Sequence, residues 1–438
     1  MIQLSTSHTL LLMVCAIISV GCKEPTREEK EFLSAKKLAE MGACQDLFAL
    51  GMHYEKGIGV RKDDEMAIEC YQMGLKKIWE EESKLPTTLE GWKRLAVEGE
   101  YNSRLKFLIG AYYDDTLRNG NSNIRMTDKP SNFVEDHKEA IKWYKEATDN
   151  PWPIDNLDAY VRLAELSDNE KSAREYLETA SGRGSAEAKT LLSEYYLYDY
   201  RKYSSYENGR RIIMHNGQRP TREPDTFRQG IRLLEEAAEI GGSSASSQLY
   251  WIYKNYDGKY PTGRDDTKAW MYRRKDDEQS AASHECKIWD SGQGTSLNLS
   301  AMLPFLKEGT SDAFLWRIQA LKGDPKAIYA LSVYYAYGKV FPKDTDEAIR
   351  LCRKSAALGH PLALMSLGNR YYDGNGVIKD EVEAYACWNV AGLKIKQGGE
   401  YIAEIEKKMA ESTRIIGQKR SRELQAEIEA NKLRSHIK

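Results

Sequence analysis

The sequence has almost no excess of either charge, and its one apolar run near the N-terminus is too short to cross a membrane. The 64 lysine and arginine residues nearly balance the 66 aspartate and glutamate residues, so the formal net charge is −2. A chain of this kind has no overall field that would attract nucleic acid or anionic lipid. The run from Leu10 to Ile18 is shorter than the roughly 20 residues that a spanning helix needs.

The motifs of common enzymes and metal sites are also missing. The sequence has no phosphate-binding loop, no Gly-x-Ser-x-Gly and no His-Glu-x-x-His. Its seven histidines are scattered, and His284 with Cys286 is the one local pair of possible metal ligands, without a second pair at zinc spacing. We therefore expect no metal ion and no other cofactor.

One short motif of acyl-transfer chemistry does occur. Ser34 and Lys37 satisfy Ser-x-x-Lys, the acylating motif of serine β-lactamases. That chemistry also needs a Lys-Thr-Gly-like element, which this sequence lacks. Ser34 and Lys37 lie in a charged segment, where such a match arises easily by chance.

A pattern near the C-terminus repeats at a fixed spacing. Leu331-Ser332-x-x-Tyr335-x-x-Gly338 recurs 36 residues later as Leu367-Gly368-x-x-Tyr371-x-x-Gly374. Two helices of this size cannot bury their apolar faces alone, so the copies must stack into a solenoid.

The first half of the repeated unit has the pattern of one helix with a defined end. Ala363, Leu367 and Tyr371 form one stripe of that helix. The small residues Ala363 and Gly368 allow a neighbouring helix to approach closely. Gly374 ends the helix, because glycine adopts positive φ without a steric penalty.

The second half of the unit begins with a helix start signal. Asp380 predicts an N-cap, and Glu383 three residues later would complete a capping box. Asp344 and Glu347 repeat that signal one unit earlier. The residues expected on the inner face of this second helix are Ala384, Cys387, Trp388 and Ala391.

The same pattern opens the N-terminal part of the chain. Leu50-Gly51-x-x-Tyr54-x-x-Gly57-x-Gly59-Val60-x-x-Asp63 is followed by Ala67-x-x-Cys70-Tyr71. On these residues the chain resembles the Sel1-like repeat family, which is related to the tetratricopeptide repeat. The resemblance covers residues 31–395 and is degenerate across 115–310. It implies an all-α fold, an α/α solenoid in which helix pairs with irregular loop insertions form a right-handed superhelix.

The N-terminal segment resembles a bacterial lipoprotein signal. The apolar run is followed by Ser19-Val20-Gly21-Cys22 and then by a polar stretch. Cleavage after residue 21 would leave Cys22 to carry lipid, with residues 22–30 as a tether. The expected location is the bacterial cell envelope, anchored by lipid and facing the periplasm. The alternatives are a plain secretory peptide, which gives a soluble periplasmic or secreted protein, and a short helix of a cytosolic regulator.

The remaining cysteines fall mostly on apolar helix faces. Cys70, Cys352 and Cys387 do so, and we expect buried free thiols there. Cys70 and Cys387 hold equivalent positions in distant units, which argues against their pairing. Cys44–Cys70 is the one pair worth testing as a disulfide.

Two insertions interrupt the repeats, at about residues 115–135 and 198–225. The second is rich in tyrosine and arginine, a composition found in interface hot spots and able to stack on and neutralise a polyanion. We expect a solvated loop, with a contact to a partner protein or a polyanion site as the alternatives. The binding residues proposed on this insertion are Tyr200, Arg201, Tyr203, Tyr206, Arg210 and Arg211.

Residues 396–438 predict charged amphipathic helices that cap the array. Their apolar stripe would include Ile405, Met409, Ile415 and Ile416. Such helices cover the last exposed apolar face of a solenoid, which keeps it soluble.

The resemblance to Sel1-like proteins implies adaptor work. We expect a monomeric, non-enzymatic protein–protein interaction scaffold that binds an unidentified protein partner along its repeat surface, without nucleic acid. The alternative is a β-lactamase-like hydrolase that acts on cell-wall-derived substrates.

Overall fold

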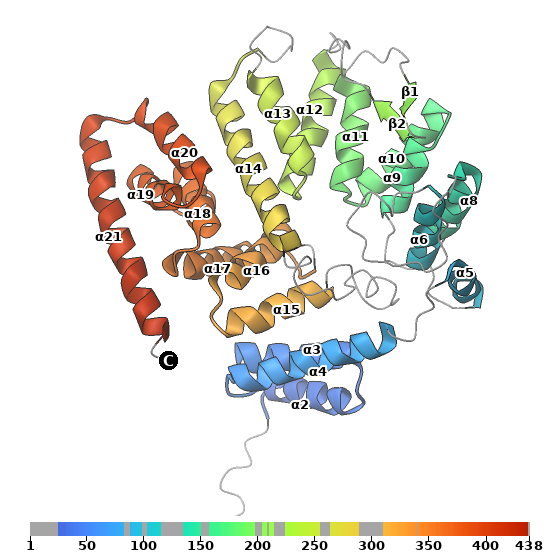
Figure 1. Cartoon of the computed structure of the whole chain (residues 1–438), viewed down its shortest axis with the longest axis horizontal. Coiled ribbons are helices and arrows are strands. Elements are labelled where there is room, and N and C mark those ends of the chain that lie inside the picture. Colours follow the sequence, from blue (N-terminus) through green and yellow to red (C-terminus); the bar gives the residue numbers. More distant parts are fainter. Residues whose placement is uncertain are drawn as a thin grey trace, which may run out of the picture. The chain divides into compact units, whose positions relative to one another are not determined.

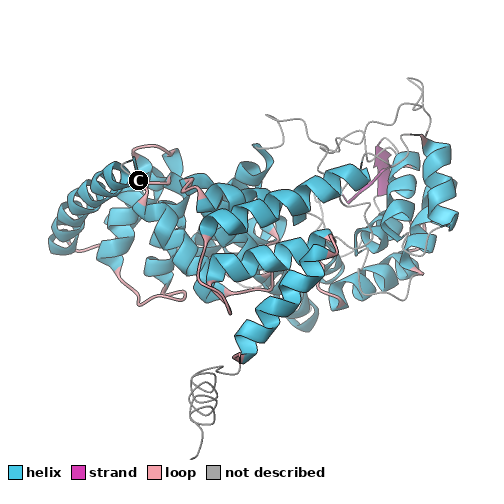
Figure 2. Cartoon of the chain, turned by 90° about the horizontal axis from the view of Figure 1, so that it is seen from below, coloured by secondary structure: helices cyan, strands magenta, loops and turns pink. Residues whose placement is uncertain are grey.

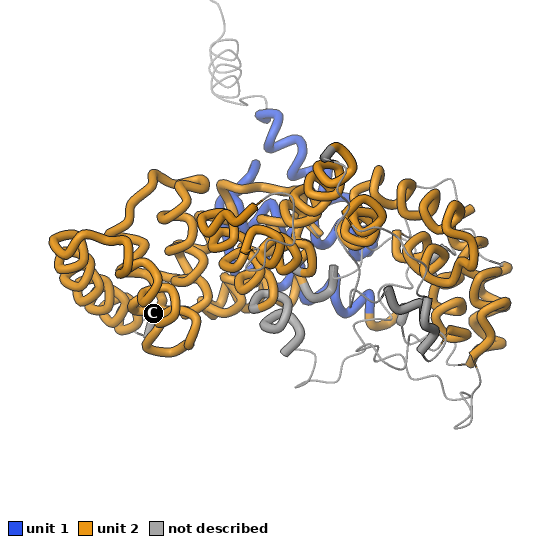
Figure 3. Tube along the Cα trace, turned by 90° about the horizontal axis from the view of Figure 1, so that it is seen from above, with its two compact units in different colours: residues 1–78 blue, residues 79–438 orange. Residues whose placement is uncertain are grey.

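The computed structural model describes most of the chain, in eleven stretches. These are residues 25–82, 88–98, 103–114, 135–149, 157–197, 204–207, 210–213, 224–254, 263–288, 310–338 and 340–436. The chain divides into two compact units, Met1–Ile78 and Trp79–Lys438 (Figure 3). Within the described stretches the fold is helical apart from one short hairpin of two strands (Figure 2).

The first unit is a small helical array at the N-terminal end of the described chain. Its helices are α2 (Arg27–Glu40), α3 (Cys44–Lys56) and the start of α4 (Asp64–Glu82). Helix α2 begins inside the segment 22–30 that the sequence assigns to a tether. Thr26 and Glu29 explain this early start, because they form a complete capping box.

The second unit contains the remaining helices and the hairpin (Figure 1). Consecutive helices pack mainly on their neighbours in sequence, as the repeat predicts. Its elements are α5 (Leu89–Glu98), α6 (Ser103–Tyr113), α8 (His137–Thr148), α9 (Leu157–Glu165), α10 (Glu170–Gly182), α11 (Ala186–Leu197), β1 (Ser204–Glu207), β2 (Arg210–Ile213), α12 (Pro224–Glu239), α13 (Ser243–Lys254), α14 (Asp266–Ile288), α15 (Thr310–Leu321), α16 (Pro325–Tyr337), α17 (Thr345–Ala357), α18 (Pro361–Asp373), α19 (Glu381–Gly392), α20 (Lys396–Glu406) and α21 (Glu411–His436).

One backbone hydrogen bond closes five of the helix hairpins in the same way. The N–H of the aspartate that begins the second helix donates to the carbonyl of the tyrosine at the end of the first, over 2.8–3.0 Å. The five bonds run from Asp63 to Tyr54, Asp136 to Tyr113, Asp265 to Tyr253, Asp344 to Tyr335 and Asp380 to Tyr371. The tyrosine and the aspartate of the repeat are therefore fixed to each other at the base of the hairpin.

This closure is independent of the length of the turn. Tyr371 and Asp380 are nine residues apart, whereas Tyr113 and Asp136 are separated by most of the first insertion. The insertion is tolerated because lengthening a loop between two fixed ends adds little to its closure entropy. Two hairpins of the degenerate middle, those closed by Asp136 and Asp265, thus keep the closure of the regular copies.

The predicted N-caps are confirmed, but the predicted capping boxes are not. The Asp380 carboxylate accepts from the N–H groups of Val382 and Glu383, as an N-cap should. The second bond of the box would run from the Asp380 N–H to Glu383, and that N–H is already donated to Tyr371. The Glu383 carboxylate instead binds Arg420 of α21, with Nε 2.6 Å away.

The same correction applies one repeat earlier. Asp344 accepts from the N–H of Glu347, while its own N–H donates to Tyr335. Glu347 binds Arg350 on its own helix, with Nε 2.6 Å from the carboxylate. In both repeats the aspartate N–H that a capping box would need donates instead to the tyrosine carbonyl that closes the hairpin.

The inner faces of the repeats are apolar, as predicted. Ala363 and Leu367 are buried on α18, and the expected residues of α19 are all buried, namely Ala384, Cys387, Trp388 and Ala391. Cys70, Cys352 and Cys387 are buried free thiols, as predicted, so Cys70 forms no disulfide with Cys44.

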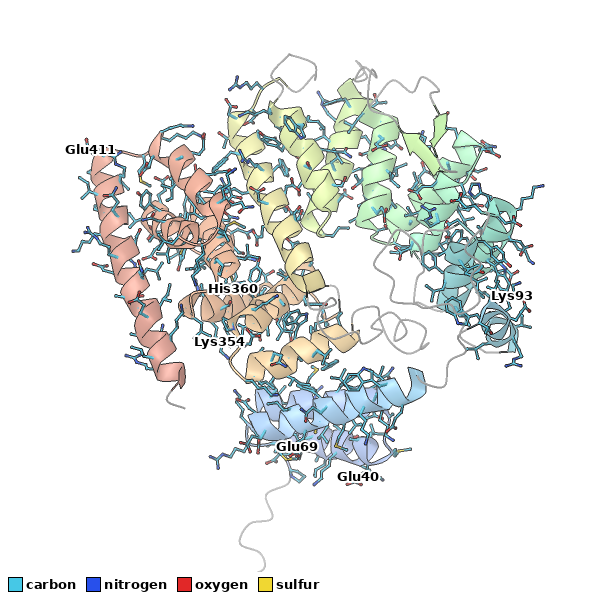
Figure 4. All side chains as sticks on the ribbon, viewed as in Figure 1. Glu40, Glu69, Lys93, Lys354, His360 and Glu411 are labelled. Atoms are coloured by element: carbon cyan, nitrogen blue, oxygen red, sulfur yellow. The ribbon has the colours of Figure 1, made fainter. Side chains whose placement is uncertain are left out.

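The C-terminal helices α20 and α21 pack against α19, but their predicted stripe is only partly right. Ile405 is buried, whereas Ile415 and Ile416 are 58% and 55% exposed. The helix is interrupted after α20, and α21 begins at Glu411 with a new helical phase (Figure 4). The face of α21 turned to the array carries Gly417, Ser421, Leu424 and Ile428 at helical spacing.

Candidate functional site

Helix α14 links two parts of the second unit that are far apart in sequence. It begins as the second helix of its hairpin with α13, capped by Asp265. It also contacts α16 and α18, beyond the segment 289–309. Figure 1 shows it standing between α13 and the C-terminal helices.

Polar side chains make these long-range links. Arg273 forms an ion pair with Glu400 over 2.7 Å, and the Tyr401 hydroxyl donates to Asp277 over 2.7 Å. The Ser366 hydroxyl donates to Glu278. Because burial outweighs the nearby donors, the pKa of the Asp277 carboxyl is raised above its usual range. One face of α14 is thus bound to α18 and α20 through charges and hydroxyls.

An open cleft of about 330 Å³ lies beside these links, between α14 and helices α16 to α18. We refer to it as the α14 cleft. Its lining is rich in charged and amide groups: Glu239, Met271, Arg274, Lys275, Glu278, Ala336, Tyr337, Lys343, Thr345, Asn369, Arg370, Asp373 and Asn375. Most of the lining residues carry polar or charged side chains, which can orient a ligand that has polar groups of its own.

Arg274 is the most deeply buried charge of the cleft, with 2% of the residue exposed. It forms an ion pair with Asp373 of α18. Its guanidinium carbon lies 4.6 Å from the ring centre of Tyr372, 5.3 Å from Trp270 and 5.8 Å from Trp388. Cation–π attraction to three rings partly compensates for the lost hydration of the guanidinium.

Two further groups shape the electrostatics of the cleft. Glu278 accepts hydrogen bonds from Ser366 and, at 3.4 Å, from Asn369. Burial raises the pKa of the Tyr337 hydroxyl, and the Glu278 carboxylate adds to that shift. Tyr337 therefore stays protonated and can donate a hydrogen bond at neutral pH.

The residues proposed from the sequence for lipid attachment and for binding lie partly outside the described residues. Cys22, Tyr200, Arg201 and Tyr203 lie outside the described residues. Tyr206, Arg210 and Arg211 lie on β1 and β2, where the antiparallel register pairs Tyr206 with Arg211 and Glu207 with Arg210.

The expected loop in this insertion is therefore partly a hairpin. Asn208-Gly209 separates the two strands in the sequence. That dipeptide is a strong signal for a two-residue hairpin turn, and it could have predicted the strands.

Ser34 and Lys37, the Ser-x-x-Lys pair, are both exposed on α2. A nucleophile for acyl transfer is activated by a neighbouring base and supported by oxyanion donors in a water-poor site. An open helix surface supplies neither the burial nor the enclosure.

No pattern in the sequence predicted the α14 cleft. Its charged residues come from separate helices, and Arg274 and Asp373 are far apart in the chain. One local signal exists, because Arg274 follows Trp270 by four residues and so occupies the same helix face as a core aromatic residue. A cation on an apolar face predicts either an internal ion pair or a ligand.

Comparison with known proteins supports the repeat assignment. The family model of the Sel1 repeat matches residues 45–77, 133–151, 325–360 and 361–393. Each match includes one of the aspartates that close a hairpin onto a tyrosine. The chain therefore contains Sel1 repeats and has the all-helical Sel1-like repeat fold in paired packing.

Two solved structures resemble the chain at low identity. A protective antigen of uropathogenic Escherichia coli strains, described as displaying an SLR fold, is 18% identical over 93% of this chain and 82% of its own, with a TM-score of 0.29. A Sel1 repeat protein from Oxalobacter formigenes is 17% identical over 89% of this chain and 99% of its own, with a TM-score of 0.27. No curated protein matches the chain.

None of the described helices combines the length and apolar character needed to cross a membrane. Among the same residues, no group of three His, Cys, Asp or Glu side chains is placed to hold a metal ion.

Proposed function

We propose that this chain is a non-enzymatic scaffold that binds a protein partner along its helical repeats. The observation that carries the proposal is the repeated hairpin. Five helix pairs close by the same aspartate-to-tyrosine hydrogen bond, and their apolar faces are used in packing. The polar faces of rigid, successive pairs then form a preformed surface, which lowers the ordering cost of association.

The proposed location is the bacterial cell envelope, with lipid on Cys22 and the repeats facing the periplasm. The support is the sequence of the N-terminal segment, an apolar run followed by Val20-Gly21-Cys22. A single acyl chain gives only marginal membrane binding, so stable anchoring needs more than one chain on that cysteine.

Proximity crosslinking in the native cell tests the scaffold role. The full-length chain, tagged at its C-terminus, is crosslinked, purified and analysed for covalently attached proteins. We expect the same protein partner in independent experiments, with wild-type protein and with Ser34→Ala alike. Failure to recover any reproducible partner contradicts the scaffold role.

The hydrolase alternative has a separate test. A fluorescent penicillin would label a serine acyl-enzyme covalently. We expect no labelling of the folded protein. Labelling that disappears in Ser34→Ala would replace the scaffold proposal with the enzyme.

Membrane fractionation and intact mass test the anchor. Wild-type protein should fractionate with membranes and carry the mass of the mature chain plus lipid, whereas Cys22→Ala should lose both properties. Wild-type protein that is cleaved but unlipidated would support a plain secretory signal instead.

A further inference from the structure

We propose that the α14 cleft binds a small zwitterion, an amino acid or a short peptide, by its carboxylate. Arg274 and Arg370 would hold the carboxylate. The site is distinct from the repeat surface proposed for a protein partner, and it does not depend on that role.

The first observation is a set of buried donors that lack acceptors. Nε and Nη1 of Arg274 and Nε of Arg370 are buried, and none has a hydrogen-bond partner within the described part of the chain. Buried side-chain donors in folded proteins are normally satisfied, so an exception at a cleft calls for an explanation. Both arginines line the cleft, and their planar guanidinium groups match the two oxygens of a carboxylate.

The second observation is that Arg274 is already held in place without using those donors. Asp373 binds Nη2, and the rings of Trp270, Tyr372 and Trp388 surround the group. A carboxylate would therefore add a partner to a fixed guanidinium, and the long side chain would lose little further freedom on binding.

The charges of the cleft favour a ligand that has one negative charge and also carries hydrogen-bond donors. The lining has four basic and three acidic side chains, a net formal charge of one positive. Lys275 is paired with Glu239, and Arg274 with Asp373. A phosphate, with nearly two negative charges, would meet repulsion from Glu278. A zwitterion would offer its ammonium or amide N–H groups to Glu278 and to the side-chain oxygens of Asn369 and Asn375.

A purely internal role for Arg274 is the competing explanation. The free N–H groups would then point at the aromatic rings, and the ion pair with Asp373 would only fasten α14 to α18. That role accounts for Arg274 but not for the buried Nε of Arg370. Substitution of Arg370, which is only half-buried, therefore separates the two explanations without disturbing the core.

Tryptophan fluorescence of the full chain provides the readout, because Trp270 and Trp388 flank Arg274. The probes are alanine, the dipeptide Ala-Ala, Ala-Ala with an amidated C-terminus, N-acetyl-Ala-Ala and inorganic phosphate. The variants are Arg274→Gln and Arg370→Gln. Arg273→Gln is the matched control, an adjacent arginine whose ion pair is with Glu400 outside the cleft.

We expect a saturable response to alanine or Ala-Ala, and the tighter of the two identifies the ligand as an amino acid or a peptide. The amidated dipeptide should bind at least tenfold more weakly than Ala-Ala, and the acetylated one should bind more weakly than Ala-Ala. Arg370→Gln should weaken binding at least tenfold and Arg273→Gln should leave it unchanged.

Several results would overturn the proposal. They are the lack of a saturable response to either zwitterion, equal binding of the amidated dipeptide, tighter binding of phosphate, and unchanged binding in Arg370→Gln. The Arg274→Gln result counts only if the circular dichroism spectrum of this variant matches that of the wild type. If the spectra differ, Arg370→Gln alone decides the test.

Discussion

Gly368 of α18 lies so close to Trp388 of α19 that a Cβ added at Gly368 would be 2.6 Å from the indole ring. Two other repeats show the same contact. A Cβ at Gly51 would lie 2.4 Å from Tyr71, and one at Gly110 would lie 2.7 Å from Tyr144. The glycine on the first helix of each pair makes room for a large aromatic residue on the second.

The regular copy at 331–357 shows how this contact changes. At the positions that correspond to Gly368 and Trp388, it carries Ser332 and Cys352. The larger residue on the first helix thus accompanies a smaller one on the second. The smaller side chain on the second helix leaves room for the hydroxymethyl group of Ser332 on the first, in keeping with a close-packed interior.

This contact predicts that Gly368→Ala destabilises the second unit. The added methyl group overlaps the buried indole, and overpacking of this kind costs about 1–3 kcal/mol of unfolding free energy. Denaturant unfolding followed by circular dichroism measures it. Gly399→Ala on α20 is the control, because nothing lies within 4 Å of its new Cβ. Equal stabilities of the two variants would contradict the packing argument.

A buried ion pair fastens the region around the first insertion. The Asp114 carboxylate, 1% exposed, accepts from Arg162 of α9 at 2.8 Å and from the Tyr144 hydroxyl at 2.6 Å. Asp114→Ala should destabilise the fold by roughly 3 kcal/mol or more, because it leaves the Arg162 charge without its buried partner. Thermal unfolding measures the loss.

Glu165→Ala is the comparison for that change. Glu165 also pairs with Arg162, but its side chain is 31% exposed and its loss leaves Asp114 in place. We expect a clearly smaller effect. A Glu165 variant as unstable as the Asp114 variant would show that burial of the pair is not what matters.

Asp277 predicts a specific pH dependence. Its pKa is raised in the folded protein, chiefly by burial. A carboxyl with a raised folded pKa binds its proton more tightly when folded, so its contribution to stability falls as pH rises through that pKa. Wild type should therefore lose stability relative to Asp277→Asn between about pH 4, near the usual aspartate pKa, and neutral pH.

Thermal unfolding of both proteins across this range is the measurement. Asparagine keeps an acceptor for the Tyr401 hydroxyl, so the hydrogen bond at this position is retained. The exposed Asp346→Asn variant controls for a general change of charge. A stability difference for Asp277→Asn that is constant with pH, or that reverses sign, would contradict the assignment.

The buried thiols predict a difference in reactivity between the folded and unfolded protein. Burial raises the pKa of the Cys352 thiol to about 11 and also raises that of Cys387. The thiolate is the reactive form, so both should resist alkylation at neutral pH. Iodoacetamide labelling with peptide mapping should find them unmodified in the native protein and modified in denaturant. Rapid native labelling at either residue would show that its helix face is open.

Much of the fold follows from local sequence. Glycine at a helix end, aspartate at a helix start and small or aromatic residues on one face each have a local physical cause, and Gly374, Asp380 and Trp388 all occupy the predicted places. Where a prediction was wrong, a tertiary contact had taken the group concerned. Glu383 forms no capping box, because the Asp380 N–H donates to the Tyr371 carbonyl instead. Ile415 is exposed, because the face of α21 that carries Gly417 packs against Tyr385. The right-handed superhelix stays a prediction.

The sequence by itself determined the repeat, its helix pairs and its apolar faces, because these depend on residues a few positions apart. Only the tertiary structure decided that α14 reaches α18 and that Arg274 meets Asp373 between three aromatic rings. The physical reason is that a cleft between helices is made by side chains brought together from distant positions. A pattern of spacings along the sequence cannot predict contacts between residues that are this far apart in the chain.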